Sequence, residues 1–517
     1  MHWIAKPRFA AWLLLGLSVL SCSSLPPEAE APASYAVSPD APSLLATLSQ
    51  KILDLAPFDG TSAFLAIDHN AEALAWRLAL IDSAERSIDI QTFIWDDDAA
   101  GFLIADRVLR AADRGVRVRI LIDDYHLANT DAFLVGWDRH PQIEFRLFNP
   151  LSARAGGIQR SVDMVTHMKR LNTRMHNKSF SVDGRFAIVG GRNIGDEYMG
   201  LKASYNFLDL DVLCTGPVVD GVEAAFDLYW NSDPVYPVSS LDRKKFEGKD
   251  LLATDRVMLT EELERLRDLT PGFAAGERDW GPRFEALEDQ MSFGTGRVVY
   301  DEPSLGPELP EVNIVARVDE LAMAAEREVL AAAPYFVPDQ LMIDAVVEMT
   351  GKGVRVVAFT NSLGSNNQVA AHTGYAPWRN RLLEAGCELY ELRADATDLS
   401  EVVDTPPAAA QGVGLHAKFM VVDRRRVYVG SMNLDPRSFY LNTEMGLLID
   451  DPVLAGQLGA LYDRDISGGN SWQVRLTDDG ELRWVSDAGT LDRQPAKGTW
   501  QRMQSSLVGL LPIKKQL

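Results

Sequence analysis

One short pattern occurs twice in this chain, and the two copies constrain how everything else is organised. The first copy has His176, Lys178 and Asp183 in MHNKSFSVD, and the second, 240 residues later, has His416, Lys418 and Asp423 in LHAKFMVVD. Each copy runs through a short apolar segment into a second signature, Gly190-Gly191-Arg192-Asn193 or Gly430-Ser431-Met432-Asn433. Two matches with the same flanks are far rarer by chance than one, so the sequence predicts two related halves.

The segments HNKSFSV and HAKFMVV are apolar and β-branched enough to predict strands. Alternate side chains of a strand point the same way, so each His and its Lys are expected on one face, about 7 Å apart. Asp183 and Asp423 complete the two motifs and are expected at the hairpin turns that follow. We interpret them as structural carboxylates that hold the turn, and not as proton carriers.

The strands that return from these turns end in small residues, where backbone amides can approach an anion closely. Gly191 and Ser431 are these residues, and Asn193 and Asn433 follow them. A His, a Lys, exposed amides and an Asn describe half of a phosphate pocket, so two copies predict a whole one. Arg437 and Ser438 come a few residues after Asn433 and are further candidates for contact with the substrate.

Two histidines at one phosphate specify a mechanism. A free imidazole titrates near pH ~6.5, so one ring can be neutral while the other is charged. The neutral ring would attack phosphorus and form a phosphohistidine, and the charged ring would protonate the leaving alcohol and then activate the acceptor. Lys178 and Lys418 would balance charge on the phosphate oxygens. We therefore expect no metal and no other cofactor, because two lysines and two Asn amides already supply that stabilisation.

Each histidine also needs a hydrogen-bond acceptor for its other ring nitrogen. When LDLDVLCTGPVV is aligned with NTEMGLLIDDPVL on the shared Pro-Val, Asp209 falls opposite Glu444, and Asp211 is a possible substitute for Asp209. The alternative is that these carboxylates form ordinary surface salt bridges. The acidic runs at 96–98 and 123–124 follow predicted strands, where we expect them to cap helices and not to bind a metal.

Several longer strings resemble the phospholipase D superfamily with two His-Lys-Asp motifs, and most closely bacterial cardiolipin synthases of the C-type branch. These strings are RLNTRMHNKSFSVDG, VGGRNIGDEY, NSLGSNN, HTGYAPWRNRLLEAGCELYEL, GLHAKFMVVD and NLDPRSFYLNTEMG. The resemblance covers roughly residues 60 to 515. It implies an α/β fold of two similar α/β/α sandwich domains, related by a pseudo-twofold axis, with the active site at their interface.

The same resemblance implies the chemistry: one phospholipid gives a phosphatidyl group to the terminal hydroxyl of phosphatidylglycerol, which makes cardiolipin. It also implies that His176 is the nucleophile and His416 the acid, an order that the residues alone leave open. The helix that carries His372, Tyr375 and Arg379 would form a wall of the substrate cleft. A packed helix without ligand contact is the alternative.

Three other functions remain as alternatives. A hydrolytic phospholipase D, which releases phosphatidic acid, differs only in letting water resolve the intermediate, and the motifs do not separate the two. A phosphodiesterase or nuclease is disfavoured by the net charge of -22, because nucleic acid binding needs clustered Lys and Arg. A non-catalytic lipid-binding lipoprotein is disfavoured because both His/Lys/Asn sets are intact. The expected partners are phospholipids and a membrane surface, without nucleic acid, and no protein partner is predicted.

The ends of the chain predict its location. Residues 1–22 have the features of a lipoprotein-type signal segment that ends at Cys22, the expected site of lipidation. Ordinary secretory cleavage and an uncleaved short anchor are the alternatives. Residues 23–45 are rich in Pro, Ala and Ser and predict a flexible tether. We therefore expect a bacterial envelope protein, membrane-anchored and facing the periplasm, with Cys214 and Cys387 as buried free thiols.

The remaining boundaries follow from the repeat. Residues 46–231 are expected to form the first phospholipase D-like domain, 232–296 a connector with one exposed helix at LTEELERLRDL, and 297–517 the second domain. The last segment places Trp500, Met503, Leu507, Leu510 and Leu511 at nearly helical spacing. We expect this apolar stripe to pack on its own domain, and the alternative is that it lies on a membrane surface.

Overall fold

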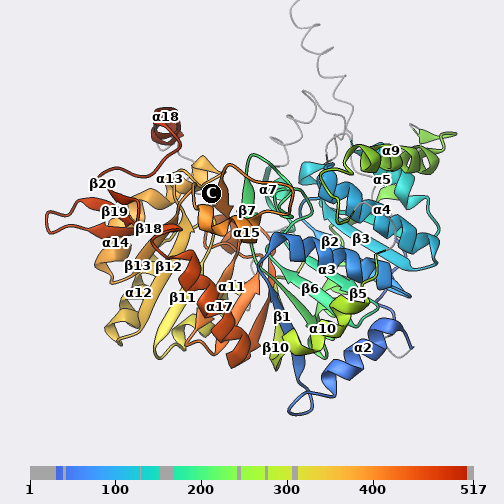
Figure 1. The fold of residues 1–517 in the computed structure, drawn as a ribbon, viewed down its shortest axis with the longest axis horizontal. Helices are drawn as coiled ribbons and strands as arrows, with labels where there is room; N and C mark the ends of the chain where they lie inside the picture. Colours follow the sequence, from blue (N-terminus) through green and yellow to red (C-terminus); the bar gives the residue numbers. More distant parts are fainter. Residues whose placement is uncertain are drawn as a thin grey trace, which may run out of the picture.

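The structure is a computed structural model that describes residues 31–38, 42–127, 130–151, 168–240, 246–273, 278–304 and 313–508. Two α/β halves lie side by side and share one large sheet (Figure 1). The predicted signal segment 1–22 with Cys22 lies outside the described residues, and so do Leu510 and Leu511.

The first half begins with the helix α2, before its first strand, and ends with the two connector helices α9 and α10. Its elements in chain order are α2 Leu44–Leu53, β1 Ser62–Ile67, α3 Asn70–Ser83, β2 Ser87–Thr92, α4 Ala99–Asp113, β3 Arg117–Asp123, η1 Asp124–His126, α5 Asp131–Asp138, β4 Ile143–Phe148, α7 Met168–Asn172, β5 Ser179–Val182, β6 Phe186–Gly190, β7 Asn206–Leu208, β8 Asp211–Thr215, α8 Val218–Trp230, β9 Val235–Pro237, η2 Val238–Ser240, α9 Leu251–Arg265 and α10 Gly281–Gln290.

The second half repeats this order and adds a C-terminal extension. Its elements are β10 Ser292–Tyr300, α11 Ile314–Met323, β11 Glu328–Ala332, α12 Gln340–Gly351, β12 Arg355–Asn361, α13 Val369–Tyr375, η4 Ala376–Trp378, α14 Arg379–Glu384, β13 Glu388–Leu392, η5 Thr397–Leu399, α15 Ser400–Val403, β14 Val413–Leu415, β15 Phe419–Val422, β16 Arg426–Gly430, α16 Pro436–Tyr440, β17 Met445–Asp450, α17 Pro452–Asp465, β18 Ser471–Leu476, β19 Leu482–Ser486, β20 Gly489–Leu491 and α18 Thr499–Val508.

The sheet makes the duplication visible. From one edge, the first half runs β9-β4-β3-β2-β5-β6-β8-β1, and the second half runs β10-β17-β16-β15-β11-β12-β13-β18. In each half two parallel pairings are flanked on both sides by antiparallel ones, and β1 pairs with β10 across the centre. Counted outward from this central pair, each strand of the first half has an equivalent strand at the same place in the second half. The two halves are therefore related by a pseudo-twofold axis, which confirms the predicted fold class.

Helices cover both faces of the sheet, as continuous apolar strands require. One face of the first half packs against α3 and α4, with Leu74 and Ile104 fully buried. On the other face, α8 and α17 share one core with strands of both halves, in which Val212 of β8 and Val421 of β15 are fully buried. The two halves therefore form a single packed body around β1 and β10.

The connector differs from the prediction of one exposed helix. It contains two helices, and both pack on the first half: Leu259 of α9 and Leu287 of α10 belong to its core. The strand β10 begins at Ser292, so the boundary predicted at 296/297 falls inside it. The sequence did not predict this packing because α9 carries few apolar side chains apart from those that contact the first half.

Part of the predicted tether lies against the first half. Backbone carbonyls of residues 32, 34 and 35 accept hydrogen bonds from Arg146, Arg119 and Arg117, which lie on neighbouring strands. The Ser34 hydroxyl also accepts a hydrogen bond from Trp230 Nε1 at 2.8 Å. The prediction of a flexible tether is therefore wrong for residues 31–38, because three arginines at the strand surface satisfy this extended backbone.

The C-terminal helix α18 also departs from the prediction. Trp500, Met503 and Leu507 are 65%, 46% and 58% exposed, so the apolar stripe faces solvent instead of packing on its own domain. The helix is held from its polar side, where Gln501 Nε2 donates to Leu363 O at 2.7 Å. Among the described residues, no helix is long and apolar enough to cross a membrane.

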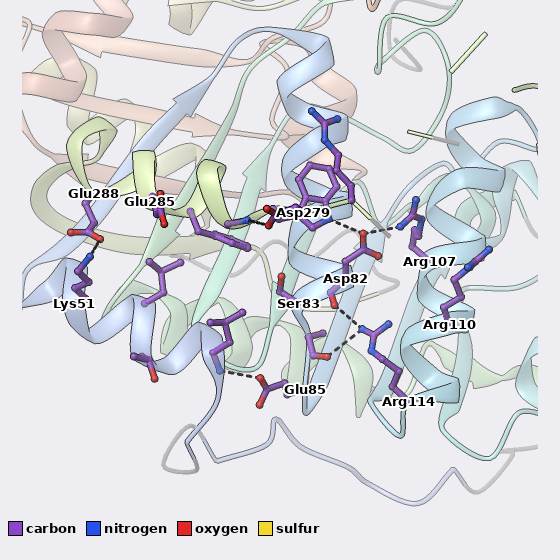
Figure 2. A pocket seen from close by; sticks show the side chains of 18 of the residues that line it. Lys51, Asp82, Ser83, Glu85, Arg107, Arg110, Arg114, Asp279, Glu285 and Glu288 are labelled. Atoms are coloured by element: carbon purple, nitrogen blue, oxygen red, sulfur yellow. Dashed lines mark hydrogen bonds and ion pairs between the residues drawn. The ribbon is translucent and has the colours of Figure 1, made fainter. Parts of the chain in front are cut away.

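A hollow of about 930 Å³ lies where α2, the end of α3, α4 and α10 meet, and no motif residue lines it (Figure 2). Two ion pairs lie within its walls: Asp82 accepts hydrogen bonds from Arg107 and Trp280, both at 2.8 Å, and Lys51 pairs with Glu288. The hollow is therefore explained by the packing of α10 on the first half.

Candidate active site

The two motifs meet at the interface between the halves. The strands β5 and β15 begin one residue after the lysine of each motif, so the prediction that His and Lys lie on a strand is wrong. The backbone there leaves its own sheet to meet the other half: His176 N donates to Thr443 O at 2.9 Å, and His416 N donates to Leu208 O at 2.8 Å. The parallel pairing of β7 with β14 extends this contact.

Each histidine is held by a carboxylate from the opposite half. His176 Nδ1 lies 2.8 Å from Glu444 Oε2, and His416 Nδ1 lies 2.6 Å from Asp209 Oδ2. Both carboxylates are buried, at 0% and 1% exposure. Of the two candidates for the first half, Asp209 takes this position, whereas Asp211 pairs with arginines (below). Because each half supplies the carboxylate that holds the other half's histidine, the two His/Lys sets lie in one site.

Glu444 is surrounded by hydrogen-bond donors. Ser431 Oγ donates to its Oε2 at 2.6 Å, and Ser438 Oγ donates to its Oε1 at 2.7 Å. These two serines were predicted to contact substrate, but the structure places their hydroxyls on Glu444. Burial raises the pKa of Glu444 to about 7, and the nearby Lys178 and the serine hydroxyls oppose that rise.

Asp209 occupies a tighter position. Its Oδ1 accepts a hydrogen bond from Leu210 N at 2.8 Å. A Cβ atom added at Gly191 would lie 2.1 Å from the same oxygen, so the glycine leaves the space that this carboxylate fills. Burial alone would raise the pKa of Asp209, but its hydrogen-bonded partner His416 and the positive charges of Lys418 and Arg192 outweigh burial and hold it below its ordinary value.

The two lysines lie in the same buried site. Lys178 Nζ donates to His176 O at 2.7 Å, and Lys418 Nζ donates to His416 O and lies 3.1 Å from His416 Nε2. Burial lowers the pKa of Lys178 to about 7, and the charge of Lys418 adds to this shift. Burial likewise lowers the pKa of Lys418 to about 8, against the pull of Asp209 and Glu444. The pKa of each lysine therefore depends on charged groups of the other half.

Both imidazoles are held in their neutral form. Burial, followed by the charges of Lys178 and Lys418, places the pKa of His176 well below its ordinary value. Burial and Lys418 lower the pKa of His416 in the same way, although Asp209 opposes the shift. Aromatic rings line the site beside them: Phe93 stands edge-on to His176 at 5.1 Å, and Phe207 lies 4.9 Å from His416.

The remaining residues that were predicted to contact the substrate differ in the hydrogen bonds that their side chains make. Asn193 Oδ1 accepts a hydrogen bond from Ile94 N at 3.3 Å, so its amide is partly engaged by the loop. The Oδ1 atom of Asn433 is buried and has no hydrogen-bond partner within the described part of the chain. Arg437 donates to Asn172 O at 3.2 Å, and its charge acts on His176. Arg437, whose charge reaches the site, is therefore the better placed for a phosphate.

The motif aspartates hold turns away from the histidines. Asp183 accepts hydrogen bonds from the backbone amides of residues 85, 86 and 87, and Asp423 accepts them from residues 326, 327 and 328. Their φ angles are +55° and +56°, and the residues that follow them also have positive φ, as tight hairpin turns require. This geometry matches the structural interpretation, although both residues belong to the motif that was predicted to be catalytic.

A buried arginine network was missed from the sequence. Arg192 donates to Asp209 O at 2.8 Å and to the Asn70 side chain, and it lies 3.3 Å from Asp211. Arg77 donates to the same Asp211 carboxylate at 2.9 Å. The only sequence signal was that Arg192 stands where the second copy has Met432. The network fixes the segment that carries Asp209.

The acidic runs and the His372 helix lie outside this site. Asp98 caps α4 through Gly101 N, and Asp123 accepts hydrogen bonds from Tyr125 N and Met175 N. His372 and Tyr375 lie on α13 and Arg379 begins α14. All three are buried, and Glu391 accepts hydrogen bonds from Tyr375 and Arg379, whereas contact of these residues with a ligand stays a prediction. In the described ranges no group of three or more His, Cys, Asp or Glu side chains is arranged to hold a metal ion. Cys214 and Cys387 are buried free thiols.

The arrangement can support nucleophilic and acid–base chemistry at one anion. Each Nδ1 is engaged by a carboxylate, which leaves Nε2 as the reactive nitrogen of each ring. Two lysines and Arg437 supply positive potential around the same space. Because the histidines are only 7% and 5% exposed, bulk water has little access to them.

Comparisons with known proteins agree with this geometry. The family described as "Cardiolipin synthase, PLD-like domain" matches residues 78–230 and 318–466. Cardiolipin synthase C of Escherichia coli K12 is 35% identical over 465 residues, which cover 88% of this chain and 96% of that protein. The major cardiolipin synthase of Bacillus subtilis 168 is 25% identical over 392 residues, 75% of this chain and 66% of that protein. The crystal structure of phosphatidylserine synthase from Haemophilus influenzae Rd KW20 superposes with a TM-score of 0.54 at 16% identity, covering 81% of this chain and 90% of that one, which shows a shared fold.

Proposed function

Because this chain belongs to the cardiolipin synthase family of phospholipase D-like proteins, we propose that it is a phosphatidyltransferase that makes cardiolipin. The donor is a phospholipid, and the acceptor is the terminal hydroxyl of phosphatidylglycerol. The observation that carries the proposal is the exchange of carboxylates, which brings two His/Lys sets from two halves to one buried site.

In the first step, Nε2 of His176 attacks the phosphorus of the donor. The bond between phosphorus and the headgroup oxygen breaks, and His416 gives its proton to that oxygen. The hydrogen bond from Nδ1 to Glu444 fixes the tautomer in which Nε2 carries the lone pair. The product is a phosphatidyl group on His176 and a free headgroup alcohol.

In the second step, His416 takes the proton of the phosphatidylglycerol hydroxyl. The oxygen attacks phosphorus, the phosphorus–nitrogen bond breaks, and His176 is released. In the empty site the pKa of His416 is lowered by burial and Lys418. A bound phosphodiester adds a negative charge beside both lysines, which raises the pKa of His416 and provides the proton that the first step needs.

A hydrolytic phospholipase D is the second candidate. The same first step would apply, and water would replace the lipid hydroxyl in the second. The low exposure of both histidines favours transfer, because a site closed to solvent protects the intermediate from water.

The membrane is the second part of the proposal. The exposed stripe of Trp500, Met503 and Leu507 on α18 offers an apolar face of the kind that lies at a lipid interface. We place lipidation at Cys22 and the protein in the bacterial envelope, facing the periplasm. Residues 32–35 contact the first half, so at most about 35 Å of chain separates the anchor from the folded body.

The test is to express the protein in bacteria that lack other cardiolipin synthases and to measure their lipids by mass spectrometry. Cardiolipin should appear with the wild-type protein and disappear with His176→Ala and with His416→Ala, each at normal protein level. The exposed His69, outside the site, gives the matched control His69→Ala, which should keep activity. Accumulation of phosphatidic acid instead of cardiolipin would identify a hydrolase, and activity in either motif variant would refute the two-histidine scheme.

A further inference from the structure

A groove lies between α11 and α12 in the second half, and the loop residues Met432 and Leu434 form one of its walls. Its volume is about 690 Å³, within the range of ~300–1,000 Å³ that is typical of small-molecule sites. None of the catalytic side chains lines it. We propose that this groove binds one fatty acyl chain of a phospholipid substrate, an inference that rests on the proposed function.

The groove is lined by flexible apolar side chains. Five of them are methionines from four different segments: Met323, Met342, Met349, Met420 and Met432. Methionine is unbranched and adapts to irregular ligands, so such a lining suits a chain of variable length and unsaturation. The ionisable residues at the rim, including Asp319 and Glu348, are acidic and exposed. Their negative charges would repel the carboxylate of a free fatty acid at the rim. They favour an acyl chain whose polar group lies outside the groove.

The polar group would lie at the catalytic end. Met432 and Leu434 face the groove, and the preceding Ser431 donates to Glu444, the partner of His176. Phe439 and Tyr440 of α16 also line the groove, while the preceding Ser438 donates to Glu444. One loop thus forms the wall of both sites, so a lipid phosphate at the histidines can place its chain in the groove.

The length of the groove also fits. The start of α12, with the exposed Leu341, lies at the catalytic end, and the lining continues to Met349 near the end of the helix. The eight residue steps from Leu341 to Met349 span about 12 Å of helix. One leaflet of a bilayer contributes about half of its ~30 Å hydrocarbon core, so the groove can cover most of one acyl chain.

A hollow also adjoins the corresponding helices of the first half, but it lies at the end of α3 and against α2 and α10. There α3 and α4 pack on each other, and Leu78, Leu103 and Val108 are buried at 2% exposure or less. In the second half the corresponding α12 leaves Leu341 73% exposed. The two halves therefore differ in how this pair of helices packs.

A groove-filling variant tests the proposal. Ala345 lines the groove from α12, and Ala345→Trp should fill it, whereas Val347, 52% exposed on the same helix and absent from the lining, gives the control Val347→Trp. The assay uses purified protein and monomeric phosphatidylglycerols of increasing acyl length. Each buried methylene should raise kcat/KM of the wild type and of Val347→Trp by about threefold to fourfold.

For Ala345→Trp, the rise should level off, while turnover of the shortest lipid stays within about twofold of the wild type. Equal chain-length dependence in both tryptophan variants would overturn the groove and leave the proposed function intact. Loss of turnover for every lipid in the wild type would instead count against the proposed function.

Photolabelling tests occupancy without turnover. Phosphatidylglycerol with a diazirine at the end of one acyl chain is irradiated with the wild-type protein, and the labelled peptides are mapped by mass spectrometry. Adducts should lie on α11 and α12 near Met323 and Met349, and unlabelled phosphatidylglycerol should compete with them. Adducts confined to other segments would contradict the assignment even if Ala345→Trp failed to fold.

Discussion

The two histidines of this protein sit in equivalent places on duplicated halves, yet their supports differ. His176 rests on Glu444, whose carboxylate also accepts hydrogen bonds from Ser431 and Ser438. His416 rests on Asp209, where the first half has Gly191 in place of Ser431. The longer carboxylate is paired with a serine, and the shorter one fills the space above a glycine.

This difference indicates how one duplicated module can supply two chemical roles. Burial raises the pKa of Glu444 to about 7, so its charge changes near neutral pH, whereas the charges around Asp209 keep that carboxylate ionised. A histidine beside a permanent anion is easier to protonate once a phosphate arrives. We therefore assign the acid role to His416 and the nucleophile role to His176.

The largest expected change in kcat comes from removing the charge of each carboxylate. Asp209→Asn should lower kcat by about 10²–10⁴-fold at both pH 6 and pH 8, because an ionised partner is lost throughout this range. Glu444 is mostly protonated below its pKa of about 7 and ionised above it. Glu444→Gln should therefore cost a few-fold at pH 6 and about 10²-fold at pH 8. Steady-state kinetics at the two pH values measure both, and a Glu444→Gln cost that does not change with pH would remove the distinction.

Exchanging the small residues gives an intermediate effect. A side chain at Gly191 would meet Asp209 Oδ1 at 2.1 Å, so Gly191→Ser should displace the carboxylate and lower kcat by about 10²-fold. Ser431→Ala should lose one hydrogen bond to Glu444 and lower kcat by about tenfold. The thermal melting temperature of each variant shows whether it is folded. Equal losses from the two changes would mean that the supports are interchangeable.

The turn aspartates should affect stability and leave chemistry intact. Asp183 is buried and accepts hydrogen bonds from three backbone amides, so Asp183→Ala should lower the free energy of unfolding by about 2–4 kcal/mol. Asp423 has the same partners in the second half but is more exposed, and Asp423→Ala should cost about 1–2 kcal/mol. Urea denaturation measures the difference. A loss of kcat per folded molecule would instead give these residues a part in catalysis.

Much of this architecture could be predicted from local patterns. The acidic run at 96–98 was expected to cap a helix, and Asp98 does cap α4, because capping acts over a few residues. The alignment of the repeats identified Asp209 and Glu444. It could not show that each carboxylate serves the opposite histidine, because that depends on how β7 and β14 pair across the halves.

Other features depend on packing that no local signal carries. Arg192 is predictable as a motif residue but not as a buried donor to Asp209 O, because its partners come from three separate segments. The serines near the phosphate site looked like substrate contacts, and only the position of Glu444 shows where their hydroxyls point. The docking of residues 31–38 and the solvent-facing stripe on α18 were missed for the same reason.

The central claim, that two unlike histidines act on one phosphorus atom, is tested most directly by trapping the intermediate. A phosphatidyl ester of p-nitrophenol needs no acid for its departure, so His416→Ala should release one equivalent of nitrophenol in a burst and retain a phosphatidyl adduct on His176, located by mass spectrometry. His176→Ala should give neither burst nor adduct. An adduct on His416 in the His176→Ala variant, or a burst without any phosphohistidine, would contradict the account.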